Sequence, residues 1–99
     1  MPPPSLADRL ADYACRLRFE DLPAEAVHET KRRFLDSIAT AVGAMSADAH
    51  AVARRCALRV QGNPGAGLFG GGRSSAEWAT FVNGLLIRYL DYNDTYLSL

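Results

Sequence analysis

The sequence ATFVNGLLIRYLDYNDT, residues 79–95, joins an amphipathic run to a polar cluster. Its apolar side chains recur three and four positions apart from Ala79 to Leu90, the spacing of one helix face. The next five positions hold two carboxylates, an amide and a hydroxyl. If the helix continues through them, Asp91, Asp94 and Thr95 share one face, because positions three and four apart are neighbours on a helix. Two acids beside a hydroxyl indicate a site that holds a proton or orients a polar substrate.

The amphipathic pattern extends back to a predicted helix start. Ser74 and Glu77 have the spacing of a capping box, in which each side chain accepts a hydrogen bond from the other residue's backbone N–H. We therefore expect this helix to open at Ser74. Its expected apolar face consists of Trp78, Phe81, Val82, Leu85, Leu86 and Tyr89.

Three further helices are expected upstream. Ser5 is a suitable N-cap for a first helix that ends near Arg18. Pro23 suits the first turn of a second helix, which Gly43 would end. A third helix is expected over roughly 49–60, before a Gly-Asn-Pro turn. The side chains expected to face inward from these helices are Leu6, Leu10, Tyr13, Ala14, Leu17, Val27, Phe34, Leu35, Ile38, Val42, Val52, Cys56 and Val60.

Residues 62–72 are glycine-rich, and only Leu68 and Phe69 have side chains able to anchor them. We expect a flexible connector containing at most a strand of two or three residues. Residues 65–70 match G-x-G-x-x-G, a dinucleotide-binding pattern. That function is disfavoured because Pro64 and a helix end precede the motif where a buried strand is required.

Composition excludes several classes of function. The formal net charge is zero, so no electrostatic footprint for nucleic acid or an anionic membrane is present. No apolar run approaches the roughly 20 residues that span a bilayer. Two cysteines without Cys-x-x-Cys spacing are typical of buried thiols in a reducing compartment, so we expect a cytoplasmic protein. His28, His50 and the basic run 31–33 are expected on solvated helix faces.

Four helices in short order predict an all-α fold with a glycine-rich connector. The last helical pattern is still strong when the sequence stops at Leu99, without a polar end. We therefore expect residues 1–99 to be the N-terminal segment of a larger helical domain.

The chain resembles the N-terminal part of the MmgE/PrpD family from about Leu6 onward. The resemblance includes the segments 10–14 and 33–39, the glycine-rich turn and the Asn83-Gly84 pair. Its most specific motif is Leu-Asp-Tyr-Asn-Asp-Thr, residues 90–95, which is similar to the 2-methylcitrate dehydratase branch. Many family members have aspartate where this chain has Asn93.

The resemblance implies a lyase that dehydrates a small tricarboxylate without a metal or other cofactor. It also implies a homodimer, and histidines and a lysine of the active site that lie beyond Leu99. Asp91 and Thr95 map onto positions that the family uses in its active site. Asp91 would be the base, the acid or the group that orients a histidine, and Thr95 would bind a substrate carboxylate or hold Asp91.

A purely structural interpretation of the same residues stays open. Arg88 would bind a substrate carboxylate bidentately, or would pair with Asp91 or Glu77. Thr95 would cap a helix end. Asn93 and Asp94 are expected to hold the turn after the helix. A calcium loop is excluded because the required glycine position holds a tyrosine.

Three alternatives to a 2-methylcitrate dehydratase follow from the same reasoning. Within the family, the chain would belong to a cis-aconitate decarboxylase or to an epimerase such as iminodisuccinate epimerase. Outside enzymes, it would be a helical interaction module that performs no chemistry.

Overall fold

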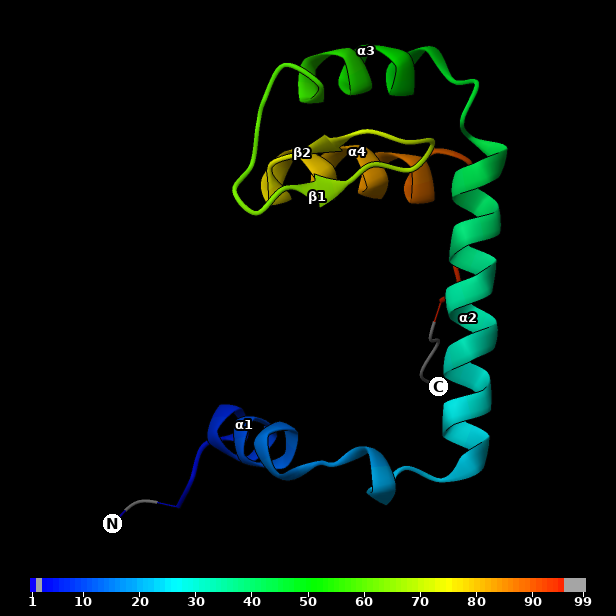
Figure 1. Ribbon diagram of the computed structural model, residues 1–99. Coiled ribbons are helices and arrows are strands. Elements are labelled where there is room, and N and C mark those ends of the chain that lie inside the picture. Colours follow the sequence, from blue (N-terminus) through cyan, green and yellow to red (C-terminus); the bar gives the residue numbers. More distant parts are fainter. Residues whose placement is uncertain (2, 96–99) are drawn as a thin grey trace. The chain divides into compact units, whose positions relative to one another are not determined.

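The computed structural model describes residues 1 and 3–95. The described part of the chain is mainly helical, which confirms the predicted fold class. The elements, in chain order, are helix α1 (Leu6–Arg16), the 3-10 helix η1 (Phe19–Asp21), helices α2 (Ala24–Gly43) and α3 (Asp48–Ala57), strands β1 (Ala66–Gly67) and β2 (Arg73–Ser74), and helix α4 (Ala76–Tyr89) (Figure 1). Among these described helices, none is both long and apolar enough to cross a bilayer.

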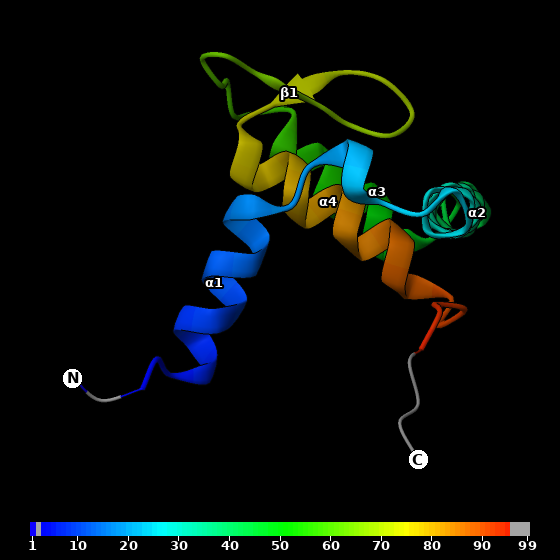
Figure 2. The same ribbon diagram turned by 90° about the horizontal axis from the view of Figure 1, so that it is seen from below.

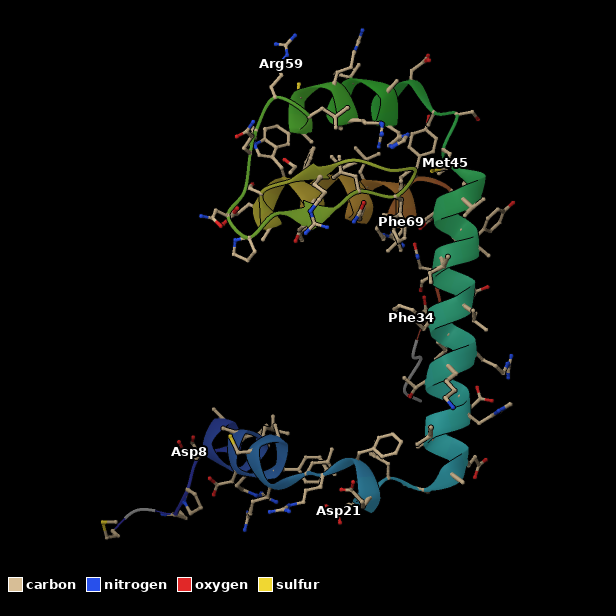
Figure 3. All side chains as sticks on the ribbon, in the orientation of Figure 1. Asp8, Asp21, Phe34, Met45, Arg59 and Phe69 are labelled. Carbon is tan, nitrogen blue, oxygen red and sulfur yellow. The ribbon has the colours of Figure 1, made fainter. Side chains whose placement is uncertain are left out.

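The chain divides into two compact units, Met1–Lys31 and Arg32–Leu99, so that α2 begins in the first and ends in the second. In the first unit, Ser5 is the N-cap of α1, as predicted. Its hydroxyl accepts from the backbone N–H of Asp8 at 3.2 Å, and the Asp8 carboxylate accepts from the backbone N–H of Ser5 at 3.0 Å. Asp8 lies at the start of this helix in Figure 3. Helix α1 ends at Arg16, two residues before the predicted end.

The predicted inward face of α1 is wrong for the described part of the chain. Leu6, Leu10 and Tyr13 are all exposed, and α1 has no buried residue. Their helical spacing shows which face is apolar, but no described residue covers that face.

The second unit is built on the packing of α3 against α4. In the view of Figure 2, α3 lies behind α4. One apolar cluster unites these helices with the glycine-rich segment through Ala53, Ala57, Leu68, Ala79 and Val82. A second cluster joins the end of α2 to α4 through Ala41, Ala44 and Leu86, with Met45 and Phe69 packed against it (Figure 3).

Small side chains occupy most of this core, and here the sequence predictions were wrong. Phe34, Leu35 and Val42 on α2 are exposed, as are Val52 and Cys56 on α3. Alanines at neighbouring positions are buried instead, because their short side chains let helix backbones approach closely. On α4, Val82 and Leu86 are buried as predicted, whereas Phe81 and Tyr89 are more than half exposed.

The glycine-rich segment is a small hairpin, not an open connector. Strands β1 and β2 pair antiparallel, with Ala66 opposite Ser74 and Gly67 opposite Arg73. Leu68 is buried, which confirms its predicted role as an anchor. The side-chain amide of Asn83 fixes the hairpin to α4: it accepts from the backbone N–H of Phe69 and donates to the carbonyl of Gly67, both at 3.0 Å.

The turn of the hairpin needs glycine for steric reasons. Gly70 and Gly72 have φ values of +85° and +88°, in the region that favours glycine. A Cβ atom at Gly70 would lie 2.6 Å from the Met45 side chain, and one at Gly72 would lie 2.9 Å from Leu58. This conformation differs from a dinucleotide-binding loop, since β1 lies inside the G-x-G-x-x-G motif instead of before it.

The predicted capping box at the start of α4 is wrong by one residue. Ser75 is the N-cap, and its hydroxyl accepts from the backbone N–H of Trp78 at 3.3 Å. Ser74 is buried in β2 and donates to the carbonyls of Ala57 and Val60. It therefore ties the hairpin to the end of α3.

Glu77 still stabilises the helix start, because hydrogen bonds from its own backbone N–H and from the Ser75 side chain lower its pKa.

Candidate functional site

Helix α4 does not continue through the polar cluster. It ends at Tyr89, with Leu90 as C-cap, and Asp91 takes a left-handed conformation with φ of +54°. The expectation that Asp91, Asp94 and Thr95 share a helix face is therefore wrong. Aspartate is one of the few residues that adopt this conformation readily, because its short polar side chain can bond locally. The spacing of apolar residues over 79–90 does not predict that the helix ends at this point.

Arg88 holds the turn that follows the helix. Its Nη2 atom lies 2.9 Å from Oδ1 of Asp91, and its Nη1 atom donates to the side chain of Asn93. The Asn93 amide in turn donates to the carbonyl of Ile87 at 3.0 Å. The pairing of Arg88 with Asp91 and the turn-holding role of Asn93 are both confirmed. No pairing of Arg88 with Glu77 is found among the described contacts.

A second arginine contacts the same turn from another helix. Arg33 of α2 forms an ion pair with the carboxylate of Asp94. Asp94 belongs to the turn that follows the end of α4, so this ion pair joins that turn to α2. Sequence reasoning assigned Arg33 only to a solvated helix face, and its partner lies 61 positions away in the chain. No local pattern could have predicted this contact.

The turn is accessible to solvent. The side chain of Asp91 is 82% exposed and that of Arg88 is 63% exposed. Thr95 is also exposed. A free carboxylate beside a guanidinium can accept a proton or orient an imidazole, but an effective acid–base site needs a covering wall that excludes water.

The two histidines differ from one another. His28 is exposed, as predicted. The prediction for His50 is wrong: its side chain is buried, and its Nδ1 atom lies 2.9 Å from the carbonyl oxygen of Met45. Its Nε2 atom has no hydrogen-bond partner among the described residues. The spacing of apolar residues along α3 did not predict this burial, because it assigned the inward face to the larger residues Val52 and Cys56.

Hollows among the described residues lie elsewhere on the chain. One of about 250 Å³ is lined by Glu77, Trp78 and Phe81. Another of about 370 Å³ lies along 13–21, and another of about 610 Å³ lies along 19–31. None of these three is lined by Arg88, Asp91 or Thr95. Within residues 1 and 3–95, no three histidine, cysteine or acidic side chains group as metal ligands.

Comparison with known proteins agrees with the motif in residues 90–95. Residues 8–99 match the family model described as the MmgE/PrpD N-terminal domain. No solved structure matches the chain. The match covers nearly the entire sequence: it begins inside α1 and includes α2, α3, α4 and the turn at Asp91. The chain therefore belongs to the MmgE/PrpD family, which includes hydro-lyases.

Proposed function

We propose that this chain is the N-terminal helical part of a lyase resembling 2-methylcitrate dehydratase, acting on a small tricarboxylate. The family match and the motif at 90–95 support the proposal. One structural observation carries it: Asp91 is held in a left-handed turn by Arg88, with its carboxylate exposed. Non-glycine residues in this conformation are uncommon and concentrate at functional sites.

Dehydration of a tricarboxylate removes a proton from carbon and a hydroxyl from the neighbouring carbon, which leaves a C=C bond and water. In the proposal, Asp91 accepts the carbon-bound proton or orients a histidine that does so. That histidine and a lysine come from the remainder of the full-length protein. Thr95 donates a hydrogen bond to a substrate carboxylate or holds Asp91.

Arg88 is the proposed substrate-binding residue. A guanidinium carries five N–H donors in a fixed plane, so its bonds to Asp91 and Asn93 leave donors for a substrate carboxylate. In this arrangement one side chain orients the acid–base group and binds the substrate. The proposal also includes a cytoplasmic homodimer that uses no metal.

The purified full-length protein tests the proposal when it is supplied with 2-methylcitrate and with citrate. Formation of the unsaturated tricarboxylate, unchanged by a chelator, is the expected result. Release of CO₂ from cis-aconitate would favour the decarboxylase alternative, and racemisation of iminodisuccinate the epimerase alternative. No turnover of any of these compounds by the folded protein would contradict the proposal and favour a non-catalytic helical module.

A further inference from the structure

The segment 90–94 contacts α2 at two positions. At one end, the Leu90 side chain lies against Gly43, where a Cβ atom would come within 3.1 Å of it. At the other end, Asp94 pairs with Arg33. Gly43 and Arg33 are ten positions apart on one helix, which corresponds to roughly 15 Å along its axis.

Backbone and side chains together bridge the distance between these contacts. Leu90 is in the right-handed helical region and Asp91 in the left-handed region, so the chain turns directly after α4. The contacts with α2 are made by side chains at both ends, Leu90 against Gly43 and Asp94 with Arg33.

Few apolar contacts hold this segment in place. Tyr92 is 75% exposed, and Asn93 is the only half-buried residue within 91–95. Arg88 fixes Asp91 and Asn93, and the Asn93 amide also donates to the carbonyl of Ile87 on α4. Asp94, the next residue, is paired with Arg33 of α2.

We infer that Arg33 is a positioning residue for the candidate site, acting through Asp94 to fix Asp91 and Thr95 relative to each other. This inference rests on the proposed function. Arg88 and Arg33 together hold both ends of the turn, one from α4 and one from α2. Small displacements of groups that must meet a substrate lower rates strongly, and a shift of 1 Å can cost about 100-fold.

The test compares Arg33→Met and Arg33→Lys in the full-length protein. Arg33→Met removes the charge and keeps much of the apolar stem, and we expect kcat to fall about 10-fold with a smaller change in KM. Arg33→Lys keeps the charge and should recover most of the activity. Asp94→Asn should cause a similar loss by itself and little further loss in the Arg33→Met background. Arg55→Met, an exposed arginine of α3, is the matched control.

Hydrogen exchange provides a readout that needs no substrate. In Arg33→Met, the backbone amides of residues 91–95 should exchange roughly 2- to 5-fold faster, with no change in residues 48–57. Unchanged exchange and unchanged kcat in Arg33→Met would overturn the inference.

If exchange rises but Asp91→Asn retains full turnover, the proposed function fails while the positioning contact stands. If Asp91→Asn is inactive and Arg33→Met is normal in both measurements, only the Arg33 inference fails.

Discussion

Asp91 combines a backbone conformation that most residues avoid with a side chain that we propose for the active site. The left-handed region costs an ordinary L-residue about 1–2 kcal/mol, and aspartate and asparagine reduce this cost through local hydrogen bonds. Here the local partner is the guanidinium of Arg88. The side chain therefore both permits the turn and presents the carboxylate.

Substitution at Asp91 should separate these two roles. Asp91→Asn retains a residue that tolerates positive φ and should change the free energy of unfolding by less than about 1 kcal/mol. Asp91→Val places a β-branched residue in the left-handed region and should lower it by about 1–2 kcal/mol. Chemical denaturation of the two variants measures the difference. Equal stability of Asp91→Val and the parent would show that the turn is not strained.

At the scale of elements, the sequence predicted the number and order of helices and the burial of Val82 and Leu86 on α4, but not which residues α1, α2 and α3 bury. Periodicity located α1 to α4 within a few residues, because amphipathic spacing and caps are local properties. It did not reveal that Ala53 and Ala57, not Val52 and Cys56, face α4, since that depends on which backbones approach closely. The contact of Arg33 with Asp94 was missed for the same reason, since it depends on how α2 and α4 are arranged in space. A turn held by Asn93 was predicted, but the left-handed conformation of Asp91 was not.

The buried and exposed residues of α4 should respond differently to truncation. Leu86 is fully buried, and Leu86→Ala should lower the free energy of unfolding by about 2–5 kcal/mol through lost burial and a cavity. Phe81 has 57% of its surface exposed, so Phe81→Ala should cost less than Leu86→Ala despite its larger side chain. Urea denaturation compares the two variants. A larger loss for Phe81→Ala would mean that another part of the protein covers this face.

The start of α4 should be sensitive to acid. Hydrogen bonds from the Glu77 backbone N–H and the Ser75 hydroxyl lower the pKa of Glu77 in the folded state. Its stabilising contribution is therefore present above its ordinary pKa and is lost as the pH falls through the lowered folded value. We expect Glu77→Gln to destabilise the protein at neutral pH but to make little difference in strong acid. The measurement is the free energy of unfolding of the parent and of Glu77→Gln as a function of pH. A difference between the two proteins that stays constant from neutral to strongly acidic pH would contradict the role of Glu77 at the helix start.

At the scale of the whole molecule, large apolar side chains lie exposed in both units. Leu10 and Tyr13 in the first unit and Phe34 and Leu35 in the second are all more than half exposed. Surfaces of this kind mark contacts with other protein. We expect the isolated 99-residue chain to be helical by circular dichroism, to bind an apolar dye and to self-associate. A monomer that melts sharply without binding dye would contradict this expectation.

The central claim is that Asp91 takes part in acid–base catalysis. The turnover number of the full-length Asp91→Asn variant tests this claim most directly. This change keeps the shape and backbone preference of residue 91 but removes its charge and basicity. Loss of an acid–base group usually costs about 10²- to 10⁴-fold in rate, and we expect a loss of this size in a variant that is folded like its parent. Asp12→Asn, at an exposed aspartate of α1, is the matched control and should leave turnover unchanged. Near-parental turnover in folded Asp91→Asn would contradict the claim and leave Asp91 with only its structural role beside Arg88.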